Sequence, residues 1–503
     1  MTLATAGRCG LVTRRLPGTH NPVDLHARLD APMLFRRTGG RSLILVDSAL
    51  RLEACQGEAS LMAMSEGGTI LLGLIADRMA AHVVSRSDRE LRLRFERCDD
   101  PDEEIRGRSP TALNLLREMT GCLTPLDHDE PFAIAALGLV GFDHVDMFEE
   151  LPERPEGEFP DLIFHLAETL VVVEAGGAAR VLAMAAGSDD PSKAHRQHCL
   201  AAERLQRTVD RCGKVAAIAP QASAKQVEAI PDLDDGQFSA VVARLKEHIA
   251  AGDIFQAVPS RTFRAPCPDP QAAFRRLAAA DPSAYQFMFD SGHGTLFGAS
   301  PETAIEIRCE GKRHIVSVSP IAGTRPRGTT PDEDSRNEAE LRLDAKEVAE
   351  HLMLVDLARN DVARISRSGT RTVPRLLAVE RFAKVMHLVS TVEGELAEGR
   401  DVIDAIRACL NVGTLSGAPK LKAIELIRAF ERSARGPYGG AIGWIAGDGS
   451  MDSAVVIRSA LVRGSVAEVR AGAGVVADSA PLAEAAETRA KAGAVLAALG
   501  VAT

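Results

Sequence analysis

DAKEVAEHLMLVDLARNDVAR, the stretch at 344–364, decides how the second half of this chain is interpreted. The apolar residues between its charges recur at helical spacing, which predicts one long helix. Glu347 and Glu350 are three residues apart, so both project from a single face of that helix. A pair of acidic side chains on a helix is most often a solvated stripe, so this pair alone identifies no site.

A second helix, predicted at 481–499, repeats the arrangement. It begins at a proline and ends just before a glycine, the residue types that favour these two helix ends. Glu484, Glu487 and Lys491 fall at positions i, i+3 and i+7 and share one face. Two carboxylate pairs on separate helices could form a cage for a hard cation such as magnesium, which prefers oxygen ligands.

Three further features each allow a structural and a functional interpretation. Arg458 stands inside an apolar strand predicted at 454–462, where a buried guanidinium needs an anion, either a ligand or an acidic side chain. The glycine-rich segments 413–420 (GTLSGAPK) and 470–474 (RAGAG) are either ordinary turns or donors of backbone N–H groups to an anion. His387, in the apolar context VMHLVS, is either a core residue or a catalytic one.

The segment at 215–235, rich in Ala, Pro and polar residues, is interpreted as a linker. It separates an N-terminal domain at 1–222, expected to be rich in strands, from a catalytic domain at 223–503 that mixes helices and strands. The other predicted elements are strands at 42–46, 69–75 and 469–476, a surface loop at 98–110, a helix at 238–251 and a strand pair at 305–318.

Composition restricts the class of protein. A formal charge of −10 over 503 residues argues against a nucleic-acid partner, which would require a basic face. Nine cysteines without a CxxC pair, and no apolar run long enough for a membrane span, favour a reduced, cytoplasmic protein. The sequence has no GxSxG elbow, no HExxH zinc helix and no GxCxG-like nucleophile, so the chain is not expected to release ammonia from glutamine itself.

Long motifs follow one another through the second half. They are GDIFQAVPS (252–260), LFGASPET (296–303), PIAGTRPRG (320–328), KEVAEHLMLVDLARNDVAR (346–364), VMHLVSTVEG (385–394), GTLSGAPK (413–420), GPYGGAIGW (436–444), VVIRSALV (455–462) and AGAGVVADS (471–479). With these motifs the chain resembles the chorismate-utilising enzymes, and among them the synthase subunits of anthranilate synthases. The resemblance is nearly continuous over 252–499 and looser in the first half, for example at 138–152.

This resemblance implies a fold and an activity. The fold is α+β, with antiparallel sheets packed face to face, helices outside, and a strand-rich N-terminal domain. The activity is that of a magnesium-dependent carbon–oxygen lyase, which makes anthranilate and pyruvate from chorismate and ammonia as the first committed step of tryptophan biosynthesis.

The resemblance also implies roles for single residues. The implied sets are the magnesium ligands (Glu350 and Glu487 directly, Glu347 and Glu484 through water), the catalytic residues (Glu302 as general acid, and His387 for the later elimination), and the substrate-binding residues Gly323, Thr324, Thr414, Tyr438, Arg458, Gly472, Ala473, Gly474 and Lys491. Tyr438 and Arg458 would hold the carboxylate of the enolpyruvyl arm. Thr414 and the backbone at 472–474 would hold the ring carboxylate. The general acid must stay protonated near neutral pH, and burial near other carboxylates raises the pKa of a Glu in this way.

Two positions separate the subfamilies. Relatives that add water to chorismate carry a lysine base where this chain has Gln256, and relatives that make aminodeoxychorismate carry a lysine where it has Ala322. Both positions therefore indicate direct addition of ammonia. The alternative activity is a 2-amino-2-deoxyisochorismate synthase of specialised metabolism, which performs the first step and keeps the pyruvyl group.

The resemblance implies a separate glutamine amidotransferase subunit that supplies ammonia, in a heterotetramer of two synthase and two amidotransferase chains. Many family members also bind tryptophan through the motifs Leu-Leu-Glu-Ser and Asn-Pro-Ser-Pro-Tyr-Met. Here the first region contains Arg36, Arg37 and Arg41, and the second reads DPSAYQ at 281–286. The doubtful tryptophan site consists of Arg37, Arg41, Ser283, Ala284 and Tyr285. We expect tryptophan to inhibit weakly or not at all.

Overall fold

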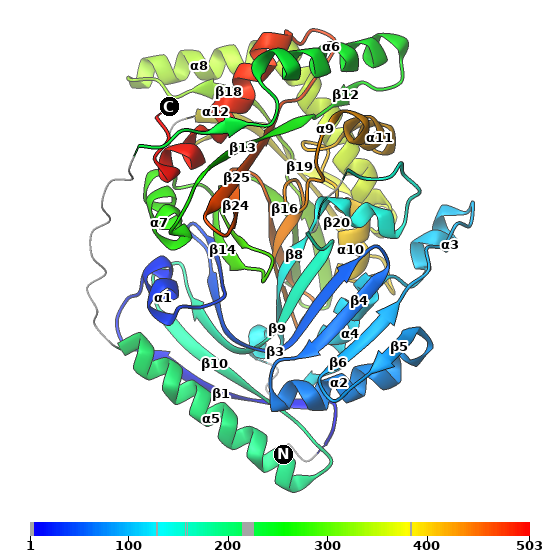
Figure 1. Ribbon diagram of the computed structural model, residues 1–503, viewed down its shortest axis with the longest axis vertical. Coiled ribbons are helices and arrows are strands. Elements are labelled where there is room, and N and C mark those ends of the chain that lie inside the picture. Colours follow the sequence, from blue (N-terminus) through cyan, green and yellow to red (C-terminus); the bar gives the residue numbers. More distant parts are fainter. Residues whose placement is uncertain are drawn as a thin grey trace.

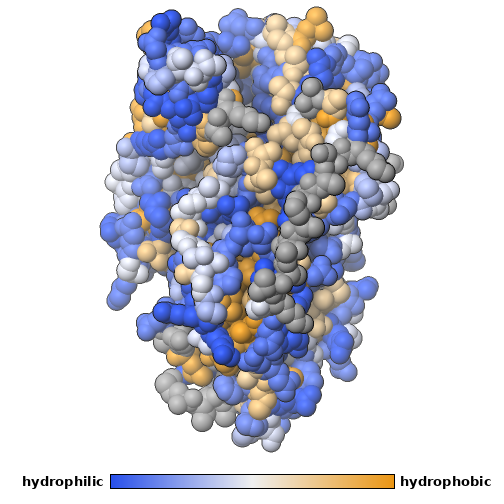
Figure 2. Space-filling view, turned by 90° about the vertical axis from the view of Figure 1, so that its left-hand side faces the viewer, coloured by the Kyte–Doolittle hydropathy of each residue, from blue (hydrophilic) through white to orange (hydrophobic). Residues whose placement is uncertain are grey.

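The computed structural model describes residues 5–126, 129–155, 157, 159–213, 226–382 and 385–502. The predicted domain boundary after residue 222 lies outside the described residues, so the division into domains stays a prediction. Among the described residues, no helix is long and apolar enough to cross a membrane. Hydrophilic side chains cover most of the face in Figure 2, and the hydrophobic ones lie mainly in a band down its middle.

Almost all strands belong to one hydrogen-bonded network, and nearly every pairing in it is antiparallel. The strands of the first half are β1 (Arg8–Leu16), β2 (Met33–Arg37), β3 (Ser42–Cys55), β4 (Glu58–Ala63), β5 (Val83–Arg86), β6 (Glu90–Arg94), β7 (Thr124–Pro125), β8 (Ala135–Val140), β9 (Leu162–Val173) and β10 (Ala179–Ala186). The strands of the second half are β11 (Ile230–Pro231), β12 (Gln256–Ala257), β13 (Ser260–Pro266), β14 (Tyr285–Asp290), β15 (Thr295–Ser300), β16 (Thr303–Glu310), β17 (Arg313–Val318), β18 (Ile321–Pro326), β19 (Thr372–Arg381), β20 (Val385–Glu395), β21 (Gly417–Ala418), β22 (Ala441–Ala446), β23 (Met451–Val455), β24 (Ser459–Arg463) and β25 (Val466–Gly472).

The helices lie outside the sheets (Figure 1). They are α1 (Pro22–Leu29), α2 (Glu66–Arg78), α3 (Glu103–Arg108), α4 (Ala112–Gly121), α5 (Pro191–Gly213), α6 (Asp235–Ala251), α7 (Pro270–Ala280), α8 (Pro331–Leu343), α9 (Ala345–Ala363), α10 (Val402–Cys409), α11 (Lys420–Phe430) and α12 (Pro481–Leu499). In Figure 1, α5 crosses β1 and β10 at the lower end, while α6, α8 and α12 lie at the upper end.

The two halves of the chain share their sheets. Strand β2 pairs with β14, and β8 pairs with β22, so each half contributes strands to the other's network. A buried cluster that includes Phe35, Leu139, Phe287 and Ile442 lies between the facing layers of strands. Face-to-face antiparallel sheets with helices outside confirm the predicted α+β fold.

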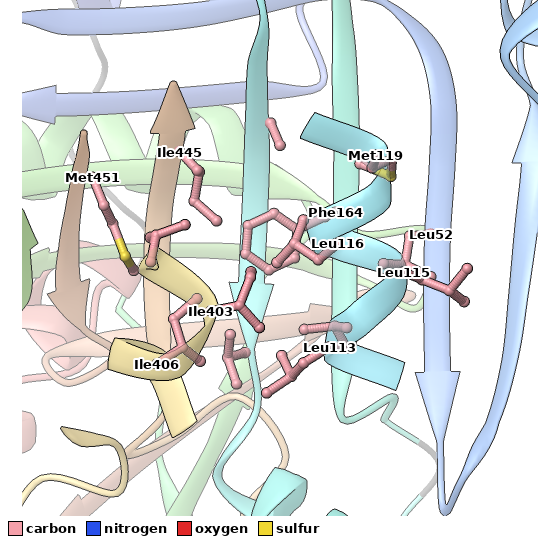
Figure 3. Packing of buried hydrophobic residues seen from close by; sticks show 14 of the residues in the cluster. Leu52, Leu113, Leu115, Leu116, Met119, Phe164, Ile403, Ile406, Ile445 and Met451 are labelled. Atoms are coloured by element: carbon pink, nitrogen blue, oxygen red, sulfur yellow. The ribbon is translucent and has the colours of Figure 1, made fainter. Parts of the chain in front are cut away.

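A second buried cluster joins helices to the outer face of these sheets (Figure 3). Leu113 and Leu116 of α4, Phe164 of β9, and Ile403 and Ile406 of α10 pack together there. The first half therefore covers the catalytic half over a large apolar contact, where burial of each large side chain stabilises the fold by roughly 1.5–3 kcal/mol.

The two helices that carry the predicted carboxylate pairs, α9 and α12, form as predicted. Helix α9 begins after Asp344, whose side chain accepts hydrogen bonds from the backbone N–H groups of Lys346 and Glu347. Helix α12 starts with Pro481, and Gly500 ends it in the left-handed conformation at φ 97°. Helix α9 packs against β18 and β20, and α12 packs against β25 and α6. The predicted helix at 238–251 and the strand pair at 305–318 are also present, as α6 and as β16 with β17.

Three predicted elements need correction. The segment 69–75 lies within α2 and is not a strand, because Ser65 caps a helix that buries Leu71, Leu72 and Ile75 on one face. The predicted loop at 98–110 contains the short helix α3. The strand predicted at 454–462 is interrupted, as described below.

Candidate active site

Arg458 lies in the break between β23 and β24. Its backbone has a positive φ of 49°, which is rare for a residue with a side chain, and its carbonyl accepts a hydrogen bond from the N–H of Ala299. The turn ends one strand and starts the next, so the guanidinium is not part of a regular strand face. Burial lowers the pKa of Arg458, and no hydrogen bond or ion pair of its guanidinium is found among the described residues. A half-buried cation without a side-chain partner among the described residues is suited to an anionic ligand.

The carboxylates of α9 and α12 lie close enough to influence one another. Burial and the charges of Glu347 and Glu487 raise the pKa of Glu350 to about 7. Burial and the charge of Glu487 also raise the pKa of Glu484. Glu487 of α12 therefore lies near Glu347 and Glu350 of α9.

These carboxylates are suitable oxygen donors for a hard divalent cation, which would relieve their mutual repulsion. Within the described part of the chain, no three His, Cys, Asp or Glu side chains form a ready-made metal cluster. A magnesium ion does not require one, because it usually keeps several waters and binds through one or two carboxylates. The donor set therefore fits such an ion.

Lys491 connects α12 to the glycine-rich segment that follows β25. Its ammonium lies 2.6 Å from the carboxylate of Glu487 and donates a hydrogen bond of 3.1 Å to the carbonyl oxygen of Gly472. A Cβ atom at Gly472 would lie 3.0 Å from the hydroxyl of Tyr438, and one at Gly474 would lie 3.3 Å from a carboxylate oxygen of Glu350. The small residues predicted to bind substrate therefore leave room between Tyr438 and the carboxylates.

Glu302 is the most buried of the carboxylates predicted for the site, only 6% exposed. Burial raises its pKa to about 7, partly offset by a hydrogen bond from Thr414 and by the charge of Lys491. The Thr414 hydroxyl donates to Oε1 of Glu302 at 2.7 Å. A carboxylic acid of this pKa holds its proton in a large fraction of molecules at neutral pH.

His387 on β20 faces the same region. Its Nδ1 lies 3.0 Å from the carbonyl oxygen of Gly323 and 3.1 Å from the hydroxyl of Thr324. Because a carbonyl oxygen only accepts, Nδ1 carries the proton and Nε2 keeps its lone pair. Burial, together with the charges of Arg458 and Lys491, lowers the pKa of His387 and keeps the imidazole neutral. His387, Thr324 and Arg458 all line a cavity of about 1190 Å³.

The two positions that separate the subfamilies lie in different places. Gln256 belongs to the site, because its Nε2 donates a hydrogen bond of 3.2 Å to Oε1 of Glu350. Ala322 lies on β18, opposite Leu388 and next to Gly323. Tyr438 is buried, which raises its pKa to about 12, so its phenol stays protonated and can donate a hydrogen bond.

A buried ion cluster behind the site was not predicted from the sequence. Glu431 lies 2.7 Å from Arg435 and 2.7 Å from Arg470, and it accepts hydrogen bonds from the backbone and hydroxyl of Ser260. Arg435 also donates to the carbonyl oxygen of Leu415 at 2.6 Å. The cluster ties together the segments that carry Gln256, Thr414, Tyr438 and Gly472. Charged residues scattered over 260–470 gave no pattern that could have revealed it.

The residues of the doubtful tryptophan site lie at the junction of the two halves. Arg37 forms ion pairs with Glu306 at 2.7 Å and with Asp452 at 3.0 Å, and the Tyr285 hydroxyl donates to Asp452 at 2.9 Å. Arg41 pairs instead with Glu174 at 3.1 Å. The backbone carbonyls of Ser283 and Ala284 accept hydrogen bonds from Thr38. These positions are thus already satisfied within the chain.

Comparison with known proteins identifies the class. A sequence model described as chorismate binding enzyme matches residues 75–497. The chain therefore belongs to the chorismate binding enzyme family. Within that family it is similar to proteins named anthranilate synthase component 1. The Vibrio cholerae protein is 43% identical over 96% of this chain and 95% of its own length, and the Escherichia coli K12 protein is 42% identical over 92% and 89%.

A pyocyanine-specific anthranilate synthase component 1 of Pseudomonas aeruginosa is 44% identical over 92% of this chain and 87% of its own length. Among solved structures, anthranilate synthase component I of Streptococcus pneumoniae TIGR4 has a TM-score of 0.72 at 28% identity, covering 91% of this chain and 92% of that one. The menaquinone-specific isochorismate synthase of Escherichia coli shares the fold, with a TM-score of 0.65 at 17% identity, covering 98% and 95%.

Proposed function

We propose that this chain is the chorismate-using component of an anthranilate synthase, which converts chorismate and ammonia into anthranilate, pyruvate and water. The observation that carries the proposal is an acid and a base in one site, the Glu302 carboxyl with a pKa of about 7 and a neutral His387. The similarity to proteins named anthranilate synthase component 1 supports the same reaction and its place in tryptophan biosynthesis.

In the first step, protonated Glu302 gives its proton to the ring hydroxyl, which leaves as water while the nitrogen of ammonia bonds to the ring. The amine then loses its extra proton, so the intermediate is an aminodeoxyisochorismate. Thr414 holds the Glu302 carboxyl in place through the 2.7 Å hydrogen bond. Gln256, an amide in place of a lysine base, cannot deprotonate water, which favours ammonia as the nucleophile.

In the second step, Nε2 of His387 removes the proton from the carbon that bears the amine. The enolpyruvyl C–O bond breaks, the arm leaves as pyruvate after gaining a proton, and the ring becomes aromatic. The neutral imidazole, whose free Nε2 follows from the Gly323 contact, supports this complete reaction over one that stops at aminodeoxyisochorismate.

Anionic groups of the substrate determine its orientation. Arg458 and Tyr438 hold the carboxylate of the enolpyruvyl arm, since one is an unpaired cation and the other a phenol that can donate. The backbone at Gly472, Ala473 and Gly474 and the side chains of Thr414 and Lys491 face the ring carboxylate. Gly323 and Thr324 flank the ring.

The site would hold magnesium through the carboxylates of Glu350 and Glu487, with Glu347 and Glu484 as the residues that would reach the ion through water. When bound, magnesium supplies a positive charge that withdraws electron density through the ring carboxylate. The ion would also neutralise carboxylates that otherwise raise each other's pKa.

Ammonia comes from glutamine through a separate amidotransferase subunit, in a heterotetramer with two copies of each chain. The name "component 1" of these relatives is consistent with a second component. We also propose a division into an N-terminal domain at 1–222 and a catalytic domain at 223–503, and that the enzyme acts in the cytoplasm.

The proposal is tested with the purified single chain, chorismate, magnesium and ammonium chloride at alkaline pH, by following anthranilate fluorescence. We expect anthranilate and pyruvate in equal amounts, and loss of activity with a chelator that magnesium restores. Replacing ammonium by glutamine should give no product. Accumulation of a non-fluorescent amino product without pyruvate would support the aminodeoxyisochorismate synthase instead, and no consumption of chorismate would contradict both.

A further inference from the structure

Gln256 lies between the two glycine-rich segments of the site. Its strand β12 pairs with β21, with Gln256 opposite Ala418. On the other side, the neighbouring Ala257 exchanges backbone hydrogen bonds with Val475. The backbone at Gln256 is therefore fixed by contacts on both sides, and its side chain has a defined direction.

The side-chain amide has two different environments. Its Nε2 donates to Oε1 of Glu350 at 3.2 Å, which fixes the nitrogen on the carboxylate side. A Cβ atom at Gly474 would come within 2.8 Å of this nitrogen, so the amide is packed against the glycine-rich backbone. The carbonyl oxygen Oε1 is buried and accepts no hydrogen bond from the described residues, although the residue is only 2% exposed.

A buried carbonyl oxygen without a donor is unfavourable, and its partner is usually a water or a ligand. The proposed reaction brings one small donor to this place, because Gln256 lies beside Glu350 and the segment that faces the substrate ring. Ammonia has three N–H groups and one lone pair. An acceptor that binds one N–H leaves the lone pair free to attack the ring, and a neutral amide does not take a proton from the nucleophile.

We propose that Gln256 forms the ammonia-binding site, with Oε1 accepting an N–H of ammonia while Glu350 holds the amide in that orientation. The inference rests on the proposed function and adds the group that positions its second substrate. Gln256 is thus a specificity-determining residue through its carbonyl oxygen, beyond its lack of a basic amine.

The test is Gln256→Met, which keeps the length and burial of the side chain and removes the acceptor. At fixed pH and saturating magnesium, we expect the KM for ammonium to rise about three- to tenfold, the effect of one lost hydrogen bond. The KM for chorismate should change less than about twofold. Gln256→Asn, which keeps the amide and withdraws it by one methylene, should raise the KM for ammonium in the same direction.

The matched control is Gln197→Met. Gln197 is also 2% exposed with an unpartnered carbonyl oxygen, but it lies on α5, beside Gly67 in the first half. This variant should have the parent's KM for ammonium, and thermal unfolding would show how much each substitution affects stability.

Equal KM values for ammonium in the parent and in folded Gln256→Met and Gln256→Asn would overturn the proposal, as would a parallel loss of affinity for chorismate. If the parent makes no anthranilate from ammonium, the proposed function itself fails, which is distinguishable because no KM for ammonium exists to compare.

Discussion

At the level of single residues, Thr414 affects the proton affinity of Glu302. Its hydroxyl stabilises the ionised carboxylate, so it lowers a pKa that burial raises to about 7. The catalytic form is the protonated acid, so at a constant concentration of free ammonia kcat/KM falls as pH rises through that pKa. Removing the hydroxyl should raise the pKa and extend activity to higher pH.

The corresponding variant is Thr414→Val, with kcat/KM for chorismate measured against pH at a constant concentration of free ammonia. We expect the alkaline limb of the pH profile to shift to higher pH by roughly half a pH unit to one unit, the effect of one hydrogen bond on a pKa. Thr169→Val is the control, because Thr169 is fully buried in the first half and its hydroxyl has no partner. A limb that stays in place would mean that Glu302 does not act as the acid.

The types of the site residues could be predicted from the sequence, but not their contacts. Thr414 and Glu302 are separated by 112 positions, and Gln256 and Glu350 by 94. Each contact depends on where a loop closes against a helix or strand. The family resemblance implied that Thr414 binds the ring carboxylate, and only the structure shows that its hydroxyl donates to Glu302.

At the level of elements, the ion cluster around Glu431 should stabilise the loops of the site. Glu431→Gln would leave Arg435 and Arg470 buried without their anion. Removing one partner of such a buried pair costs about 3–5 kcal/mol, so we expect a fall in unfolding free energy of that order, measured in urea. Turnover should fall as well, because the cluster holds the segments of Thr414 and Tyr438.

The comparison is Asp332→Asn on α8, which removes the partner of Arg336 in an ion pair whose side chains are both 75% exposed. An exposed pair contributes about 0–1 kcal/mol, so this variant should unfold like the parent. Equal stability of Glu431→Gln and Asp332→Asn would show that the buried cluster is not a structural support.

Helices with complete periodicity and clear ends could be predicted, as α9 and α12 show. The segment at 69–75 could not, because five Ile and Leu residues with Thr69 and Gly73 fit a strand as well as a helix, and Ser65 decides between them. The strand at 454–462 was predicted without its break, since a positive φ at an arginine has no signature in the sequence.

At the level of the whole molecule, the junction of the two halves determines the expected response to tryptophan. A tryptophan site needs an acceptor for the ligand's ammonium. The carboxylates of Glu306 and Asp452 are both engaged by Arg37, and Asp452 also accepts from Tyr285. The structure therefore gives a physical reason for weak inhibition, because Arg37 occupies the carboxylates that could otherwise accept hydrogen bonds from the ligand's ammonium.

We expect tryptophan at micromolar concentrations to leave ammonia-dependent anthranilate formation unchanged, with inhibition only at concentrations at least about a hundredfold higher, equivalent to about 2.7 kcal/mol of lost affinity. A titration of tryptophan at subsaturating chorismate measures this. Half-inhibition in the micromolar range would show that a functional effector site remains.

The sharing of strands between the two halves also has a consequence for synthesis of the chain. Strand β8 at 135–140 finds its neighbour β22 only at 441–446, and β2 at 33–37 finds β14 only at 285–290. A growing chain therefore leaves the ribosome with these strand edges unpaired until about 250 further residues for β2, and about 300 for β8, have been added. Unpaired edges favour association with other chains. During translation, the first half is thus the part with the greatest need for a chaperone.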